Sequence, residues 1–150
     1  MMNIREGMPL FVRNEGEWQS HYTNTDPDCV VLDEYDVHII CEFPDEPYAA
    51  YRQTSTNTWA DGRTSQFLFE AQYNAERNRI TWDSGGLKGE LWEIDEATLY
   101  LTFSFDDMPD VQVCEMIQLS KCGNHRARTW HWFKDEQLTQ RTLVKERRIK

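Results

Sequence analysis

The chain has 150 residues, of which 39% are hydrophobic and 13% aromatic, and its formal net charge is −10. This length is typical of one domain, and the apolar and aromatic content excludes an intrinsically disordered chain. The acidic charge argues against a general nucleic-acid partner, because phosphate binding depends on a basic surface.

Strand-like runs recur about every ten to twelve residues and are separated by turn-forming residues. The first five runs are EWQSHYTNT (17–25), YDVHIICEF (35–43), YAAYRQTSTNTW (48–59), TSQFLFEAQY (64–73) and RITWD (79–83). The other five are LKGELWEI (87–94), TLYLTFSF (98–105), VQVCEMIQL (111–119), HRARTWHWF (125–133) and LTQRTLVKERR (138–148). The only helical piece that we expect is a short lead of about one turn within residues 3–14.

The connections between these runs are short, which favours antiparallel hairpins, since parallel strands need long crossovers. Asp61-Gly62 is the most specific turn signal and predicts a type I′ turn, with positive φ at both central residues. The sequence therefore predicts one all-β domain over residues 1–150. We expect a single antiparallel up-and-down β-barrel of about ten strands, because closure removes exposed strand edges. A β-sandwich is the alternative.

Alternate residues of a strand point to opposite faces, so each run divides into two sets. The set that is richer in apolar residues is expected to face the barrel interior. It comprises Val37, Ile39, Cys41 and Phe43; Phe67, Phe69, Ala71 and Tyr73; Leu99, Leu101, Phe103 and Phe105; and Val111, Val113, Ile117 and Leu119.

The same division carries charged residues inward. Glu115 shares a face with Val113 and Ile117, and Glu90 shares one with Trp92 and Ile94. In RARTWHWF, an inward-facing pair of Trp130 and Trp132 brings Arg126 and Arg128 with it. Buried charges are costly unless they are paired, hydrated or bound to a ligand.

Two interpretations of these charges stay open. Arg126 or Arg128 forms a structural ion pair or closes one barrel end over Trp18, or the arginines orient a carboxylate, carbonyl or phosphate of a ligand. Arg52 is a further candidate, although its strand phase is ambiguous. The aromatic residues Tyr22, Tyr73, Trp92, Trp130 and Trp132 suit a flat, conjugated ligand and equally suit a packed core.

Common catalytic motifs are absent from the sequence: there is no P-loop, G-x-G-x-x-G, G-x-S-x-G or H-E-x-x-H. The four histidines, His21, His38, His125 and His131, have no metal-ligand spacing and are expected on the outer face, which argues against haem binding. We predict no metal site and no cofactor. The best acid/base candidate is Glu115, followed by Glu90.

Cys29, Cys41, Cys114 and Cys122 form no C-x-x-C pair, so we interpret them as reduced thiols. No apolar run approaches the ~20 residues of a membrane span, and MMNIREGMPLF lacks the apolar core of a secretory signal. These features predict a cytoplasmic protein with no membrane span. Residues 126–150 hold eight Lys/Arg against three Asp/Glu, a basic end that offsets acidic neighbours or contacts an anionic partner.

NEGEWQSHY and RARTW resemble the calycin superfamily, in which a Gly-x-Trp on the first strand is covered by an Arg near the last strand. Gly16-Glu17-Trp18 and Arg126 or Arg128 match those positions. REGMPLFVRNEGEW, TWADG and RARTWHWFKD are similar to a little-characterised, cyanobacterial-type family of lipocalin-like proteins. This resemblance implies a calycin barrel and no established activity. Related barrels include fatty-acid-binding proteins, haem-binding nitrobindins, phycobilin lyases and some cyclases and isomerases.

Three functional hypotheses follow. The first is a soluble barrel that binds a small hydrophobic or conjugated ligand, with an acidic or carbonyl group held by Arg126, Arg128 or Arg52. The second is a cyclase, isomerase or bilin-lyase-like enzyme in which Glu115 moves a proton and an arginine stabilises negative charge. The third is an interaction module without a cavity. The sequence does not predict the ligand or the oligomeric state.

Overall fold

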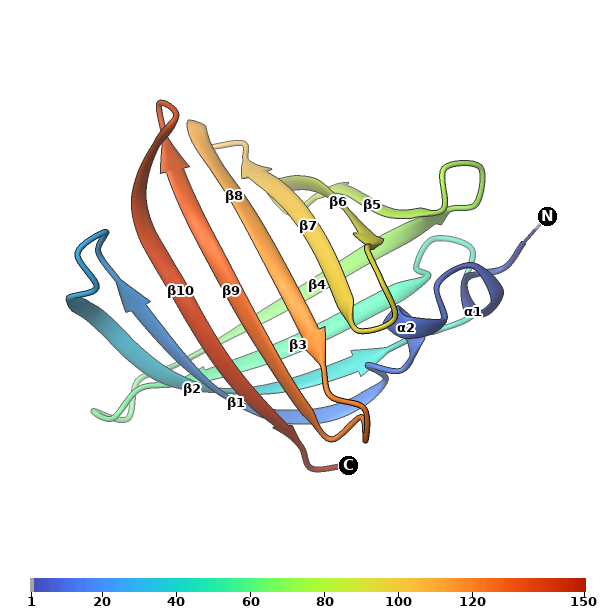
Figure 1. Cartoon of the computed structure of the whole chain (residues 1–150), viewed down its shortest axis with the longest axis horizontal. Helices are drawn as coiled ribbons and strands as arrows, with labels where there is room; N and C mark the ends of the chain where they lie inside the picture. Colours follow the sequence, from blue (N-terminus) through green and yellow to red (C-terminus); the bar gives the residue numbers. More distant parts are fainter. Residues whose placement is uncertain (1) are drawn as a thin grey trace.

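A computed structural model describes residues 2–150, which form ten strands after two four-residue helices (Figure 1). The helices are α1 (Ile4–Gly7) and α2 (Pro9–Val12). The strands are β1 (Gly16–Thr25), β2 (Val31–Glu42), β3 (Tyr51–Thr58), β4 (Thr64–Asn74), β5 (Arg79–Ser84), β6 (Leu87–Glu93), β7 (Thr98–Phe105), β8 (Met108–Leu119), β9 (His125–Lys134) and β10 (Gln137–Arg148). Each predicted run forms a strand, and the helical lead is confirmed.

The strands form one closed antiparallel barrel in chain order, and β1 pairs with β10 to complete it. The predicted fold class is therefore confirmed. The hairpins β1–β2, β3–β4, β5–β6, β7–β8 and β9–β10 all turn at one end, which we call the open end. The opposite end carries both helices and the C-terminus, and we call it the closed end (Figure 1).

Both short helices lie at the closed end. Each begins with a residue that suits a helix start. Asn3 caps α1 by accepting the Glu6 N–H, and Pro9 opens α2 with a preset φ. Leu10 and Phe11 of α2 are buried, and the Phe11 ring packs on Phe43 and Tyr51 at centroid distances of 5.1 and 4.7 Å. Apolar packing therefore seals this end of the barrel.

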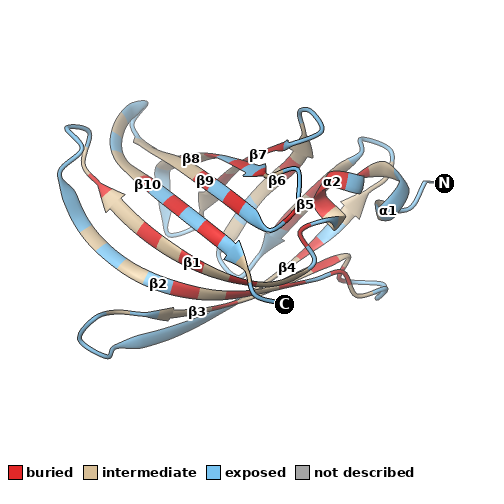
Figure 2. Cartoon of the chain, turned by 60° about the horizontal axis from the view of Figure 1, so that its bottom comes forward, coloured by how far each residue is buried: buried red, intermediate tan, exposed pale blue. Residues whose placement is uncertain are grey.

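Buried residues alternate along the strands, as the bands of Figure 2 show. The predicted inward sets of β2, β7 and β8 are confirmed: Val37, Ile39, Leu99, Leu101, Val113 and Ile117 all belong to the core. The prediction for β4 is confirmed only in part, since Ala71 is buried while Phe67 is 43% exposed. The barrel is thus well packed at the closed end and less covered along β4.

The predicted inward face of β6 is wrong. Leu91 is buried and Ile94 is 52% exposed, so Leu87, Gly89 and Leu91 face inward while Glu90 and Trp92 face outward. The reason is steric: a Cβ on Gly89 would lie 2.7 Å from both the Trp82 ring and Phe103 Cβ, so the inward position opposite Trp82 excludes a side chain. Because Gly89 contributes no apolar side chain, the outward set with Trp92 and Ile94 contains more apolar surface and was predicted to face inward.

The turn after β3 also differs from the expected type I′ geometry. Gly62 has a φ of +91°, but Asp61 is not among the residues with positive φ. The Gly62 N–H donates to the Trp59 carbonyl at 3.0 Å, and the Trp59 N–H donates to the Arg63 carbonyl at 2.9 Å. The hairpin therefore turns where predicted, with one left-handed residue after a tight turn instead of two.

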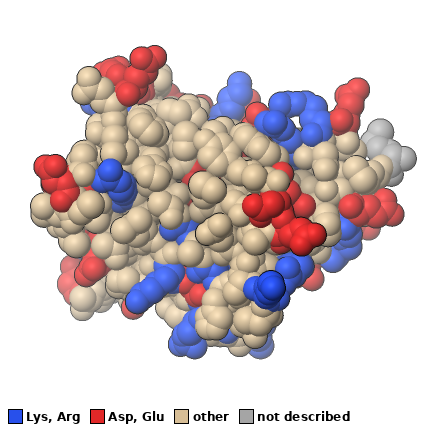
Figure 3. Space-filling view, in the orientation of Figure 1, with Lys and Arg blue, Asp and Glu red and all other residues tan. Residues whose placement is uncertain are grey.

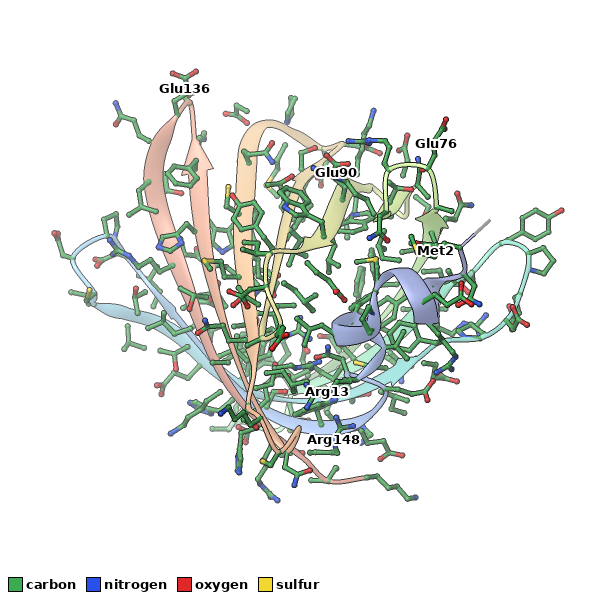
Figure 4. The ribbon with its side chains drawn as sticks, turned by 45° about the vertical axis from the view of Figure 1, so that its right-hand side comes forward. Met2, Arg13, Glu76, Glu90, Glu136 and Arg148 are labelled. Atoms are coloured by element: carbon green, nitrogen blue, oxygen red, sulfur yellow. The ribbon has the colours of Figure 1, made fainter. Side chains whose placement is uncertain are left out.

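Lys and Arg side chains gather along the lower part of Figure 3, on the side where the C-terminal end of β10 lies in Figure 1. Arg148 and Arg13 meet there, as Arg148 Nη2 donates to the Arg13 carbonyl at 2.6 Å (Figure 4). Glu136, in the β9–β10 turn, lies far from them at the open end (Figure 4). Within residues 2–150, neither helix has the length needed to cross a membrane.

Candidate functional site

Trp18 closes the barrel interior near the helices. Its ring lies between the guanidinium groups of Arg126 and Arg148, at 4.3 and 4.4 Å, and its indole N–H donates to the Asn14 carbonyl at 3.0 Å. Strand pairing creates this stack, because Trp18 on β1 is opposite Arg148 on β10. Two cation–π contacts on a fully buried ring stabilise this end of the barrel.

Glu146 is the anionic centre of a buried charge cluster. Arg126 donates two hydrogen bonds of 2.8 Å to its carboxylate from Nε and Nη2, and Arg128 Nε donates a third at 2.8 Å. The Ser20 hydroxyl donates to the second carboxylate oxygen at 2.5 Å. The two arginines and the hydroxyl hold the pKa of Glu146 at about 2 despite its burial, so it is ionised at neutral pH.

Each of the three guanidinium nitrogens of Arg126 has a partner within the chain. Beyond its paired bonds to Glu146, its Nη1 donates to Asn14 Oδ1 at 2.9 Å, and its side chain is only 1% exposed. This arrangement matches the structural interpretation of the sequence, an ion pair that closes one barrel end over Trp18. Arg128 lies one position further toward the open end on the same face of β9.

Glu115 faces Arg128 from β8, with 3.3 Å between Arg128 Nη1 and Glu115 Oε2. Burial raises the pKa of Glu115 to about 7, and the attraction of Arg128 offsets this only in part. Glu115 is therefore present in both protonation states near neutral pH. Its carboxyl group is the one acidic side chain of the cluster that can gain or lose a proton under physiological conditions.

The space around the charge cluster is small. A cavity of about 40 Å³ lies among Arg126, Arg128, Tyr51, Trp82 and Leu101, with further apolar side chains around it. A volume of this size holds a few water molecules, whereas drug-sized ligands need roughly 300–1,000 Å³. A hollow of about 810 Å³, open to solvent, lies on the outer side of β1, β8, β9 and β10, and its lining includes Ser20, Arg126 and Glu146.

Inward-facing rings follow one another toward the open end and form what we call the aromatic wall: Tyr22, Phe103, Phe105, Trp130 and Trp132. Trp130 contacts Tyr22 and Phe103 edge-on, at centroid distances of 6.1 and 5.6 Å. Trp132 stacks on Trp130 at 5.9 Å and on Phe105 at 5.7 Å.

The wall is not fully covered by the chain itself. Trp130, Trp132 and Phe105 are only partly buried although they point inward, and Phe67 on β4 is 43% exposed. The open half of the barrel therefore presents partly exposed aromatic rings to solvent.

Two indole N–H groups at this wall and beside it lack hydrogen-bond partners. Among residues 2–150, the Nε1 atoms of Trp82 and Trp130 are the buried side-chain N or O atoms with no partner. The other wall tryptophan, Trp132, donates to the Thr142 hydroxyl at 2.9 Å. Buried donors without partners are rare and call for an explanation such as an acceptor outside the chain.

The structure brings together six of the residues singled out from the sequence: Tyr22, Glu115, Arg126, Arg128, Trp130 and Trp132. All of them lie on β1, β8 and β9 and point into the barrel. Their spacing on adjacent strands carries them from the charge cluster to the aromatic wall.

Three predicted site residues lie outside. The expected inward orientation of Glu90 and Trp92 is wrong, and the ambiguous phase of Arg52 resolves outward. Arg52 forms a surface network with Glu46 and Glu70 at 2.9 and 2.8 Å, because its neighbour Tyr51 takes the inward position. Glu90 pairs with Arg77 and Arg79 at 3.0 and 2.9 Å. Trp92 lies on the same outer face, where Arg79 covers its ring at 4.0 Å and Tyr100 packs beside it.

Glu146, Asn14 and Trp82 are site residues that the sequence reasoning missed. A signal for Glu146 existed in β10, where Thr142, Val144 and Glu146 alternate with Leu143, Lys145 and Arg147. The set with fewer full charges faces inward and carries Glu146 with it. Asn14 lies outside any periodic run, so no strand pattern could identify it.

The histidines do not take part in the interior. His21 pairs with Asp36 at 2.9 Å and His38 pairs with Glu17 at 3.1 Å on the outer surface, and His125 is exposed. No group of three or more His, Cys, Asp or Glu side chains within residues 2–150 is arranged to hold a metal ion. Cys41 is buried, whereas Cys29 and Cys122 are exposed thiols.

Solved structures with similar folds include an S-type phycobiliprotein lyase from Guillardia theta, with a TM-score of 0.71 and 15% identity over 99% of this chain and 94% of that one. Rv2717c from M. tuberculosis aligns with a TM-score of 0.67 and 11% identity, covering 96% of this chain and 98% of that one. A DUF3598 family protein of unknown function from Nostoc punctiforme aligns with a TM-score of 0.65 and 17% identity.

The alignment with the Nostoc protein covers 92% of this chain and 48% of that one, so this chain spans about half its length. A scan against models of protein families and a search of curated proteins found no match. At these identities the likeness concerns the fold, a closed antiparallel β-barrel, and not a shared activity.

Proposed function

We propose that the protein binds a small, flat, hydrophobic or conjugated molecule against the aromatic wall in the open half of the barrel. The observation that carries this proposal is the combination of stacked, partly exposed inward rings with the unpartnered indole N–H group of Trp130. A conjugated ligand would cover the exposed parts of the rings, and a carbonyl or similar acceptor on it would pair with the buried N–H group after a turn of the Trp130 ring.

The charge cluster sets the inner limit of this site. Because the cavity around Arg126 and Arg128 is only about 40 Å³, the body of the ligand would lie beyond it, on the wall. Arg128 and Glu115 border the wall, since Glu115 is paired in register with Trp130. These two groups would meet the polar end of the ligand, with Arg128 favouring an acidic or carbonyl group.

The likeness in fold to a phycobiliprotein lyase supports conjugated pigments as the first ligand class to test. The experiment is a titration of the purified protein with bilins, other pigments, fatty acids and isoprenoids, followed by quenching of tryptophan fluorescence. We expect saturable, stoichiometric quenching by at least one flat conjugated compound and weaker binding of saturated chains. Absence of saturable quenching across the panel would contradict the proposal.

A second candidate function is acid/base catalysis at the same place, and the pKa of Glu115 favours it. A carboxyl group with a pKa of about 7 can both give and take a proton near neutral pH, and Arg128 could stabilise developing negative charge. The variant Glu115→Gln, which keeps the shape of the side chain, would then bind a substrate and fail to convert it. Equal turnover by the variant would remove this candidate.

A further inference from the structure

The outer part of β4 has no strand beside it on one edge. β4 pairs with β3 along residues 64–71, but it pairs with β5 only through Gln72, Tyr73 and Asn74. From Thr64 to Ala71, the edge toward β5 therefore carries no strand pairing within residues 2–150. In Figure 1 this part of β4 runs away from β5 and β6 alongside β3.

This edge is also exposed on both faces. Thr64, Ser65, Gln66, Phe67 and Leu68 are all exposed, and successive residues point to opposite sides. Phe67 is 43% exposed on the inner face and Leu68 is 57% exposed on the outer face. An unpaired strand with apolar side chains on both faces is a template for adding another strand.

The chain protects a comparable edge elsewhere but not here. The first residues of β2, Val31–Tyr35, also extend beyond the pairing with β3, which begins at Asp36. That segment also exposes Val31 and Leu32, but it carries Asp33 and Glu34, and charged side chains on an edge oppose strand addition. The six residues of β4 from Thr64 to Phe69 carry no charge, in a protein whose net charge is −10.

We propose that the outer edge of β4 pairs with β4 of a second copy of this chain, antiparallel and about a two-fold axis. A two-fold axis perpendicular to the sheet keeps the faces matched, so residues of equal parity lie opposite each other. With the axis at Leu68, this residue lies opposite Leu68 of the second copy on the outer face. On the inner face, Phe67 lies opposite Phe69 of the second copy.

The edge is also complementary to itself in charge. In this register the only ionic residue nearby, Glu70, lies opposite the amide of Gln66, so no two like charges meet across the strands. Apolar pairs at the axis and aromatic pairs beside it are favourable cross-strand neighbours. A second copy of the chain therefore provides an uncharged strand edge with the same apolar residues, which can pair with β4 without repulsion between like charges.

Sedimentation velocity over a range of protein concentrations tests the pairing. We expect a reversible change from the mass of one chain to that of two, favoured by added salt because screening weakens the repulsion between two acidic chains. Leu68→Lys would place two ammonium groups at the axis and weaken the dimer by about tenfold or more. The matched control Ile94→Lys changes a similarly exposed apolar residue that follows β6, outside the proposed interface, and should leave the dimer unchanged.

A cross-linking experiment tests the register independently of that variant. In a Cys29→Ser, Cys122→Ser background, Leu68→Cys should form a disulfide-linked dimer on mild oxidation, because the two side chains face each other at the axis. Gln66→Cys should not, since its two copies lie about 14 Å apart in this register. A monomer at all concentrations, a dimer insensitive to Leu68→Lys, or equal cross-linking at both positions would overturn the proposal.

Discussion

Arg128 and Glu115 meet inside the barrel across β9 and β8, with 3.3 Å between Nη1 and Oε2 and both side chains nearly inaccessible to solvent. Arg128 also donates to Glu146, so one guanidinium group serves two carboxyl groups with opposite pKa shifts. Glu146 has two arginines and a hydroxyl to stabilise its charge, whereas Glu115 has a single, longer contact. Because of this difference, the contributions of the two acids to the stability of the fold change with pH in opposite directions.

Glu115→Gln should flatten the pH dependence of stability between about pH 4.5 and pH 7. Because the folded pKa of Glu115 is raised from 4.5 to about 7, its contribution is fully present below pH 4.5 and declines as the pH rises to 7. The decline is on the order of 3 kcal/mol, at about 1.4 kcal/mol per unit. Urea unfolding of both proteins at pH 5, 6, 7 and 8 measures it, and identical slopes would contradict the assignment.

Glu146→Gln should destabilise the barrel by roughly 3–5 kcal/mol at neutral pH, because it leaves Arg126 and Arg128 buried without their shared counter-charge. The folded pKa of about 2 lies below the ordinary value of 4.5, so this contribution is present above pH 4.5 and lost as the pH falls toward 2. Urea unfolding provides the free energies. The control Glu90→Gln, in a partly exposed pair, should cost at most about 1 kcal/mol.

Gly89→Ala should destabilise the protein by about 1–3 kcal/mol, since the added methyl group overpacks the interior. Its Cβ would lie 2.3 Å from the Thr102 carbonyl oxygen and 2.7 Å from Trp82 Cζ2. Thermal unfolding by circular dichroism gives the loss of stability, and the near-ultraviolet spectrum should change because the Trp82 ring is displaced. An unchanged melting temperature and spectrum would mean that the β6 interior is looser than the structure describes.

Trp130→Leu should weaken binding of a conjugated ligand by about tenfold or more, because it removes ring contact and the unpartnered N–H group together. The matched control is Trp92→Leu, which removes a ring from the outer surface and should leave affinity within about twofold. Calorimetric titration of both variants provides the dissociation constants. Equal losses in the two variants would place the ligand outside the barrel.

The fold could be predicted from the sequence because most runs have one apolar face. In TLYLTFSF, Leu99, Leu101 and Phe103 share a parity and are buried, so period and burial agree. The prediction for LKGELWEI was wrong because Gly89 and Leu91 form its inner face, whereas the larger apolar residues Trp92 and Ile94 lie on the outer face. A glycine chosen for close packing has no hydrophobic signal, so periodicity alone could not identify the inner face.

The candidate site could be predicted only where it lies on regular strands. Arg126, Arg128, Trp130 and Trp132 share one parity of β9, and their common inward direction follows from that alone. The parity of β10 indicates that Glu146 points inward, but its pairing with both arginines, and that of Asn14 with Arg126, required three-dimensional information. The exposure of the aromatic wall depends on how far the strands diverge at the open end, which no sequence period encodes.

The most direct test of the proposed ligand site is a nuclear magnetic resonance titration of the six indole N–H groups in the protein labelled with ¹⁵N. Single Trp→Phe variants assign the signals of Trp82, Trp92, Trp130 and Trp132. A flat conjugated ligand that binds as proposed should shift the Trp130 and Trp132 signals in a saturable way and leave Trp92 unmoved. Shifts confined to Trp92, or none at Trp130 with a ligand that quenches fluorescence, would contradict binding at the aromatic wall.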